Sequence, residues 1–493
     1  MKTAGARTRA TLAAIAVIAA TTVLPGCATR DVDARVSSSP ATPWQPPPEG
    51  RMPPAKPTPP PAIPAAYLQP GATITLEQVL DVALRNNPVT RTSWHQARAA
   101  AANLGAKRAE YFPDLELDAN VTRSKQTSVG GRFITLQTTY GPSVSLSWLL
   151  LDLGGRAADV DEARNALFSA DWTHDAVIQN LVLQVEVAFY QYQNARAQAA
   201  AAEATLKQAR ESLAAAEERH RAGVATIADV LQAKTAVSQA ELALETAQGS
   251  IQTLRGALAT AAGVSPDIPV EVAPLAENVN VEQIGETVDA LIERAQSQRP
   301  DLAAARFEVL KAQSHVRSIR SEGLPTLAAA GSVGRVYFYN SPGLPFADNY
   351  SGAILFRFPI FTGGQNVYET LEAREQARSA EGQAETLKDQ VVLQVWTSYY
   401  NLKTAAQRIR TARDLLTAAT QSQEVAAGRY RAGVGSILDL LIAQSAYANA
   451  RAQEAQARSD WFVALAMLAH DTGSLGPPAD RPVPSAGEKG AGQ

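Results

Sequence analysis

The sequence is poor in the residues that build disulfides, metal centres and catalytic sites. It holds one cysteine, three methionines and five histidines in 493 residues. A lone cysteine excludes a disulfide within the chain, and the histidines are scattered without the spacing of metal ligands. No nucleophile elbow and no phosphate-binding glycine loop is present. We therefore expect neither an enzyme, nor a bound cofactor, nor a metal site.

An excess of charge of one sign is also lacking. The chain carries 45 basic and 48 acidic residues, a formal net charge of -3. No cluster of basic residues is interleaved with aromatic residues, as binding to nucleic acid would require. Nucleic acid is therefore not an expected partner.

The N-terminus has the pattern of an export signal. Three basic residues precede an apolar run, Thr11 to Leu24, that is too short to cross a bilayer comfortably. The run ends in Leu24-Pro25-Gly26-Cys27, which resembles a bacterial lipobox with an acylated cysteine. We predict a signal peptide over 1–26 and a lipid anchor on Cys27, the alternative being a buried or reactive lone thiol. In lipoproteins of this kind an aspartate directly after the cysteine tends to retain the protein at the inner membrane. Here that residue is Ala28, so the resemblance favours the outer membrane.

Proline and glycine mark both ends of the remaining chain. The segment 27–74 is rich in proline, as in TPWQPPPEGRMPPAKPTPPPAIP. Proline disfavours helices and central strands, so this segment is expected to be an extended tether or a strap along the folded body. Residues 473–493 are rich in glycine and proline and are expected to form a flexible tail.

Between these ends, segments with apolar residues at helical spacing are followed by segments that alternate between apolar and polar residues, and this succession occurs twice. Apolar residues recur at helical spacing in 76–84, Pro88 ends that segment, and a second helix is predicted over 89–110. The other half repeats this succession around Pro300, with helices up to about residue 322. Two pairs of helices are therefore predicted.

Each pair of helices is followed by residues that alternate between apolar and polar. In the first half the alternation covers 115–122 and 144–148, and in the second half 326–339 and 350–358 occupy the same places. Loops rich in glycine, serine, asparagine and proline join each pair. Each half is thus predicted to carry one β-hairpin, and the simplest explanation is a small two-sheet domain with one solvated face.

Long helical segments come next in both halves. There is no glycine or proline between Arg156 and Ala222, and a continuous helix of that length would extend about 100 Å. Apolar residues recur from Ile178 to Tyr192 and again from Val392 to Leu402, which predicts helices packed on neighbours. Return helices are expected to end near residues 262 and 470.

One stretch occurs twice. RHRAGVATIADVLQAKTA (219–236) and RYRAGVGSILDLLIAQSA (429–446) share ten of eighteen residues at an offset of 210. Arg-Ala-Gly-Val between two helical segments predicts the sharp turn of a helical hairpin. We predict an α+β fold with an internal two-fold repeat, the first repeat over 75–285 and the second over 286–472.

Four strands cannot close a barrel on their own. Strands cross a membrane only as a closed barrel, because exposed edges are not tolerated in lipid. Three copies would supply twelve strands and twelve long helical segments. A homotrimer is the resulting hypothesis, although counting strands also allows dimers or tetramers.

The two repeats, the glycine pairs that open the long helices, the paired turns and the lipobox together resemble the outer-membrane factor (TolC-like) family, in its lipidated OprM/NodT-like branch. The resemblance covers roughly Thr75 to His470. It implies a trimeric channel-tunnel with a composite 12-stranded transmembrane β-barrel and a long periplasmic α-helical barrel. It also implies a lipid-anchored exit duct of the bacterial outer membrane. Its partners would be a periplasmic adaptor (membrane fusion) protein and an inner-membrane pump of the RND type.

The resemblance assigns roles to the duplicated stretch. Its turns would be the periplasmic tips at which the adaptor docks, through Arg221, Gly223, Val224, Arg431, Gly433 and Val434. Asp229 matches a position that bonds to a tyrosine of the neighbouring hairpin, and Tyr430 stands at that tyrosine's position. Asp439 matches an acidic ring inside the constriction. The gate is predicted to consist of Asp229, Tyr430, Asp439, Leu438, Leu441 and Ile442.

The chain departs from the family pattern at two places. Gly435 stands where one subtype carries a bracing arginine, and Ile442 stands where a second acidic ring is expected. The gate is therefore predicted to depend more on apolar packing than on ionic links. Asp229 and Asp439 also have a simpler explanation as caps on the first turn of the return helix.

The predicted function is passive conduction of substrates out of the cell. Two alternatives remain open. One is the outer-membrane component of a type I protein secretion system, and the less favoured one is a structural periplasmic coiled-coil lipoprotein that forms no channel. The cargo is not indicated, because drugs, metals, solvents and peptides all leave through similar tubes.

Overall fold

The computed structural model describes residues 73–127, 134–267, 271–274, 285–339, 343 and 345–476. The chain divides into two compact units, Met1–Pro60 and Pro61–Gln493, and every described residue belongs to the second unit. The predicted signal peptide, the predicted lipidation site Cys27 and nearly all of the proline-rich segment lie outside the described residues.

The described helices and strands follow the same order twice. The first set is β1 (Thr73–Ile74), α2 (Leu76–Asn86), α3 (Pro88–Ala109), β2 (Asp114–Thr127), β3 (Ile134–Leu151), α4 (Gly155–Arg221) and α5 (Ile227–Ala261). The second set is β4 (Glu271–Val272), α6 (Val288–Gln298), α7 (Pro300–Ser321), β5 (Thr326–Phe338), β6 (Phe346–Arg357), α8 (Gln365–Arg431) and α9 (Ile437–Asp471). Both α4 and α8 have 67 residues, and both α5 and α9 have 35.

Capping residues and prolines set the bounds of the short helices. The Thr75 side chain accepts a hydrogen bond from the backbone N of Gln78 at 3.4 Å and begins α2. Pro88 and Pro300 occupy the first turns of α3 and α7, where a missing N–H costs nothing. The prediction that Pro88 ends the preceding segment holds to within two residues, and the same proline begins the next helix.

The four long strands form one antiparallel sheet in the order β2-β3-β5-β6. Its register places apolar residues opposite apolar ones, as in the row Leu117, Val144, Val333 and Tyr350. The neighbouring row on the other face is polar and consists of Glu116, Ser145, Ser332 and Ser351. Because side chains alternate along a strand, the sheet has one apolar and one polar face.

The strand predicted over 144–148 is too short, since β3 runs over Ile134–Leu151. The dipeptide Gly141-Pro142 is a turn signal in sequence, yet it lies inside the strand. The pairing of β3 with β5 skips these two residues, so the proline loses no hydrogen bond to that neighbour. A Cβ at Gly141 would collide with the carbonyl of Arg335, so the close approach of β5 requires glycine there.

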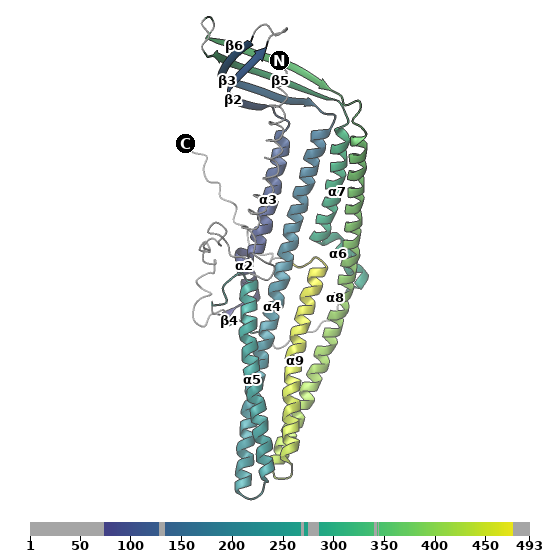
Figure 1. Ribbon diagram of the computed structural model, residues 1–493. Coiled ribbons are helices and arrows are strands. Elements are labelled where there is room, and N and C mark those ends of the chain that lie inside the picture. Colours follow the sequence, from purple (N-terminus) through teal and green to yellow (C-terminus); the bar gives the residue numbers. More distant parts are fainter. Residues whose placement is uncertain are drawn as a thin grey trace, which may run out of the picture. The chain divides into compact units, whose positions relative to one another are not determined.

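The long helices pack along one another and hold the largest apolar core. Figure 1 shows α4, α5, α8 and α9 side by side, and contacts join α4 to α5 and α9 and join α8 to α9. The predicted apolar stripe of α4 is buried, with Val182 1%, Val185 0% and Phe189 3% exposed. Since α4 begins directly after β3 and ends at the first turn, the sheet and this turn lie at opposite ends of a helix about 100 Å long.

A buried arginine fixes the start of α7 against α8. The guanidinium of Arg299 donates to Asp301 at 2.6 Å and to the side chain of Gln394 at 2.7 Å. Burial acts to raise the pKa of Asp301, but the hydrogen bond and the charge of Arg299 outweigh it, and the pKa lies below its usual value. The hydrogen bond to Gln394 ties the α6–α7 corner to the long helix α8.

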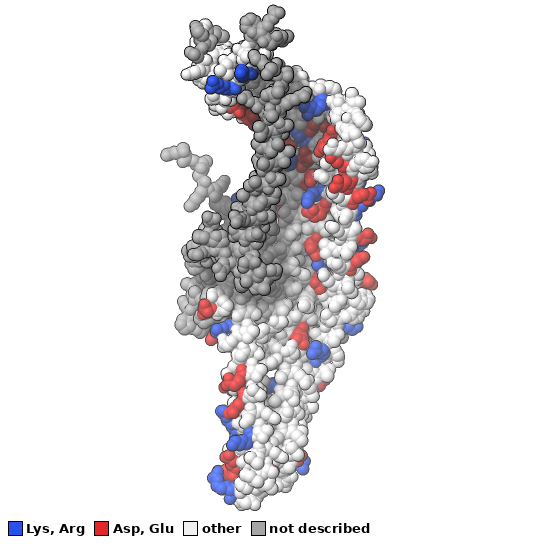
Figure 2. All heavy atoms as spheres, viewed as in Figure 1, with Lys and Arg blue, Asp and Glu red and all other residues white. Residues whose placement is uncertain are grey.

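No helix in the described part of the chain is both long enough and apolar enough to cross a membrane. In Figure 2 the visible described atoms of the sheet are mostly uncharged, whereas charged side chains follow the helices. The first residues of the predicted tail are described, and Leu475 among them is 9% exposed and belongs to the core around α4.

Candidate functional site at the two hairpin turns

The first turn ends α4 with a glycine in the left-handed conformation. Gly223 has φ +75°, its N–H donates to the carbonyl of His220, and the N–H of Val224 donates to that of Arg219, both at 2.9 Å. These two bonds form a Schellman motif, which satisfies carbonyls at the end of a helix. The prediction of glycine at the break is confirmed.

The second turn has the same backbone. Gly433 has φ +79°, its N–H donates to the carbonyl of Tyr430 at 3.1 Å, and the N–H of Val434 donates to that of Arg429 at 3.0 Å. The chain therefore reverses direction through the same Schellman motif twice, between α4 and α5 and between α8 and α9.

The return helices begin with caps that differ in the bonds of the aspartate carboxylate. At α5 the side chain of Thr226 accepts from the N–H of Asp229 at 3.3 Å, and the Asp229 carboxylate accepts from the N–H of Thr226 at 2.8 Å. At α9 the Ser436 hydroxyl accepts from the N–H of Asp439 at 3.1 Å. The simpler explanation of Asp229 as a helix cap is confirmed, while the carboxylate of Asp439 makes no bond back to the Ser436 N–H.

The predicted adaptor contacts lie at the surface of the two turns. Val224 is 72% and Val434 70% exposed. The Arg221 side chain pairs with Glu218 at 3.0 Å, and the Arg431 side chain donates to the carbonyl of Ala427 at 3.3 Å. Each turn thus presents an exposed valine next to an arginine.

Tyr430 is the buried centre of the second turn. It is 6% exposed and packs with Ile437 and Leu440 in one apolar cluster. The guanidinium of Arg219, from the other hairpin, lies 4.5 Å from the centre of its ring, in cation–π contact. Among the described residues its hydroxyl has no hydrogen-bond partner, although the oxygen is buried. An arginine of the first hairpin therefore covers the tyrosine of the second.

The predicted hydrogen bond between Asp229 and Tyr430 is not formed in this structure. The carboxylate of Asp229 binds Thr226, and the tyrosine hydroxyl is unpaired within the described part of the chain. The cap satisfies the carboxylate locally, which is the physical reason for the difference. Whether the two residues belong to a gate stays a prediction.

The predicted apolar gate residues divide into two groups. Leu438 and Ile442 are 53% and 60% exposed, four residues apart on one face of α9. Leu441 is partly buried against the tyrosine cluster. Sequence reasoning missed Ile437, Leu440 and Arg219, although the helical spacing of Ile437, Leu440 and Leu441 was a usable signal.

No group of three or more His, Cys, Asp or Glu that could hold a metal ion occurs among the described residues. The chemistry that the two turns offer is exposed backbone, small apolar side chains, guanidinium groups and the exposed carboxylate of Asp439. Such a surface suits a docking partner or a constriction.

The sequence of this chain is similar to those of known proteins. A family model described as "Outer membrane efflux protein" matches residues 79–264 and 291–474. Protein CyaE of Bordetella pertussis is 28% identical over 413 residues, which cover 82% of this chain and 85% of that protein. The toluene efflux pump outer membrane protein TtgC of Pseudomonas putida is 26% identical, covering 75% of this chain and 76% of that protein. The outer membrane protein TolC of Escherichia coli is 24% identical, covering 79% and 80%.

Solved structures share the fold. The outer-membrane channel OprN superposes with a TM-score of 0.73 at 20% identity and covers 81% of this chain and 90% of its own. The outer membrane protein VceC from Vibrio cholerae superposes with a TM-score of 0.69 at 22% identity and covers 81% of this chain and 96% of its own.

Proposed function

This chain belongs to the outer membrane efflux protein family, and from that premise we propose that it is the outer-membrane exit duct of a tripartite efflux system. In this proposal it conducts substrates passively, without a catalytic step, from an inner-membrane pump and a periplasmic adaptor to the outside. The observation that carries the proposal is the sheet with one apolar and one polar face.

The two faces of the sheet suit lipid on one side and water on the other. Large apolar side chains on the apolar face are exposed, with Leu117 78%, Val121 76% and Ile354 75%. The opposite face carries polar groups, including the hydroxyls of Ser332 and Ser351, which are hydrogen-bonded to each other at 2.8 Å. The strands have 14, 18, 13 and 12 residues, against the roughly 9–11 that a tilted strand needs to cross a bilayer.

The two free edges of this sheet support assembly of several copies. Within the described residues β2 and β6 each pair on one side only. Unpaired backbone groups are too costly in lipid, so the edges must meet those of other copies. We propose a homotrimer with a composite twelve-stranded barrel, to which each chain adds four strands.

The long helices support the periplasmic part of the duct. Because α4 and α8 carry the chain about 100 Å from the sheet to the turns, a ring of such helices would form a tube below the barrel. The matched lengths of the two halves support the internal two-fold repeat. An acyl chain on Cys27 would add an anchor in the outer membrane.

We place the gate and the adaptor site at the two turns. Threefold symmetry would bring the exposed Leu438, Asp439 and Ile442 of three chains around one axis, where three carboxylates attract cations. The exposed Val224 and Val434, with their left-handed glycines, would offer backbone and small side chains to the hairpin of an adaptor. The RND type of pump remains part of this proposal.

Conductance in planar bilayers tests the duct. Purified protein should insert and form channels that are mostly closed, and Asp229→Ala or Tyr430→Phe should increase the open probability. Protein that forms no channel, including as these variants, would favour the structural coiled-coil alternative. Channels with unchanged opening in both variants would remove the two residues from the gate and leave the duct intact.

Cross-linking to the adaptor tests the docking role. Gly433→Trp should abolish cross-links between this chain and its adaptor, while light scattering still reports the trimer. The matched control is Gly428→Trp, on the preceding helix, where a Cβ meets nothing within 4 Å. Cross-linking that survives at Gly433 would refute docking at this turn.

A further inference from the structure

A pocket between α4, α8 and α9 is lined by four arginines. It has a volume of about 720 Å³, and Pro274, two residues after the end of β4, also lines it. We call it the arginine pocket after Arg196, Arg413, Arg451 and Arg458, which line it together with one acidic residue, Glu454. Its ionisable lining therefore carries a clear excess of positive charge.

Two of these arginines have no ionic partner within the part of the chain that the structure describes. Arg451 and Arg458 are only partly exposed and form neither a hydrogen bond nor an ion pair there. Arg196 donates to the backbone carbonyl of Val272 at 2.7 Å, a neutral acceptor that leaves its charge uncompensated. Partial burial of unpaired guanidinium groups costs free energy, and an anion in the pocket would offset this cost.

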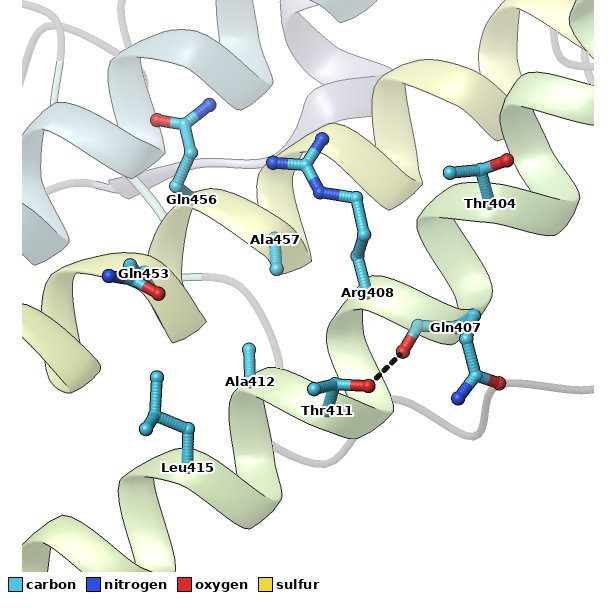
Figure 3. Close-up of a pocket in the computed structure, with 9 residues that line it drawn as sticks. All are labelled: Thr404, Gln407, Arg408, Thr411, Ala412, Leu415, Gln453, Gln456 and Ala457. Atoms are coloured by element: carbon cyan, nitrogen blue, oxygen red, sulfur yellow. Dashed lines mark hydrogen bonds between the residues drawn. The ribbon is translucent and has the colours of Figure 1, made fainter.

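Several arginines elsewhere on these helices are paired. In the adjoining pocket between α8 and α9, shown in Figure 3, Arg408 extends toward α9 beside Gln456. Its guanidinium pairs with Asp460 at 3.3 Å, and Asp460 also accepts from Gln456 at 2.6 Å. On the first hairpin Arg210 pairs with Glu241 at 2.9 Å. The excess charge of the arginine pocket is thus a local feature and does not reflect the general composition of the helices.

We propose that the arginine pocket binds a polyanion whose phosphate or carboxylate groups pair with Arg451 and Arg458. The planar guanidinium binds either oxyanion through two parallel hydrogen bonds. The two arginines are two helical turns apart on α9, about 10 Å along its axis, and their long side chains allow both to reach one ligand that carries several oxyanions. The volume lies in the usual range of small-molecule sites. This binding goes beyond conduction and does not depend on it.

Calorimetric titration of the full-length protein in detergent tests the site. The probes are myo-inositol hexakisphosphate for phosphates and benzenehexacarboxylate for carboxylates, each in 150 mM salt. We expect saturable binding of at least one probe, with one site per chain, and the stronger probe identifies the class of oxyanion. The double variant Arg451→Gln with Arg458→Gln should weaken binding at least tenfold.

The matched control removes the same charge elsewhere. Arg108 on α3 and Arg374 on α8 are exposed and lie outside the pocket, so Arg108→Gln with Arg374→Gln should bind as the wild type does. Equal weakening in both double variants would mean non-specific attraction and overturn the proposal, as would the absence of saturable binding by the wild type.

A variant with the opposite expected effect covers the case in which the double variant fails to fold. Glu454→Gln removes the only acidic group among the described lining residues and should tighten binding severalfold. Unchanged or weaker binding would contradict the proposal. Channel formation in bilayers without any probe is measured separately, so loss of the site and loss of the duct are distinguishable.

Discussion

The turns after α4 and after α8 have nearly the same sequence and the same backbone, yet only the second is built into an apolar core. At the position of the buried Tyr430 the first turn has the exposed His220. Ile437 is 4% exposed, whereas the matching Ile227 is 57% exposed. The difference teaches that the local sequence sets the reversal of the chain, while the neighbours of each helix decide what becomes buried.

A side chain of the first turn also packs against the second turn. Arg219 covers the ring of Tyr430, while its counterpart Arg429 is exposed. A Cβ at Gly433 would lie 3.2 Å from Nη2 of Arg219, whereas a Cβ at Gly223 would meet nothing within 4 Å. The two hairpins are therefore coupled at this end through one arginine.

The largest expected difference in stability between the two turns comes from removing the aromatic ring of Tyr430. Tyr430→Ala should lower the free energy of local unfolding at the second turn by about 3–5 kcal/mol, because it empties the centre of a buried cluster. The matched His220→Ala should change the first turn by no more than about 0.5 kcal/mol. Hydrogen exchange of amides in 426–442 and 216–232 measures both, and similar changes at the two turns would contradict the contrast.

The isoleucines that begin the return helices should differ next. Ile437→Ala removes a buried side chain and is expected to cost about 2–4 kcal/mol. Ile227→Ala acts on an exposed side chain and should cost about 0.5 kcal/mol or less. The same exchange measurement reports both. A large loss of protection at Ile227→Ala would show that the first turn is packed in the native assembly.

The two turn glycines test the coupling through Arg219. Gly223→Ala and Gly433→Ala should each cost about 1 kcal/mol, since both force a side chain into the left-handed conformation. Gly433→Ala should cost about 0.5 kcal/mol more, because it displaces the arginine from the tyrosine ring. In an Arg219→Gln background this excess should vanish, and an excess that persists there would rule out the arginine as its cause.

The smallest difference is expected at the helix caps. Asp229→Ala breaks the reciprocal bonds with Thr226 and should destabilise the start of α5 by about 1 kcal/mol. Asp439→Ala removes only a charge near the N-terminus of α9 and should cost about 0.5 kcal/mol. Exchange rates of the first-turn amides of both helices measure these costs. A larger effect at Asp439 would indicate contacts of its carboxylate that one chain does not contain.

Most of the helix ends could be predicted, because their causes are local. The absence of glycine and proline between Arg156 and Ala222 predicted α4 almost to the residue, and Pro88 and Pro300 marked the joints of the shorter helices. The length of β3 could not be predicted, because Gly141-Pro142 resembles a turn and is accommodated only by the skipped pairing with β5. The bond between Asp229 and Tyr430 is not formed within this chain and their role in a gate stays a prediction, because the spacing along the chain does not say which side chain a cap has already engaged.

By itself the sequence determined where this chain reverses, where its helices begin and end, and that two similar halves follow one another. These features depend on glycine at positive φ, on proline at first turns and on the period of apolar residues, all of which act within a few residues. Only the tertiary structure decided that one turn is buried and the other exposed, that Arg219 covers Tyr430, and that arginines from three helices line one pocket. Burial and the pairing of charges depend on residues brought together from distant segments, so a local sequence pattern cannot predict them.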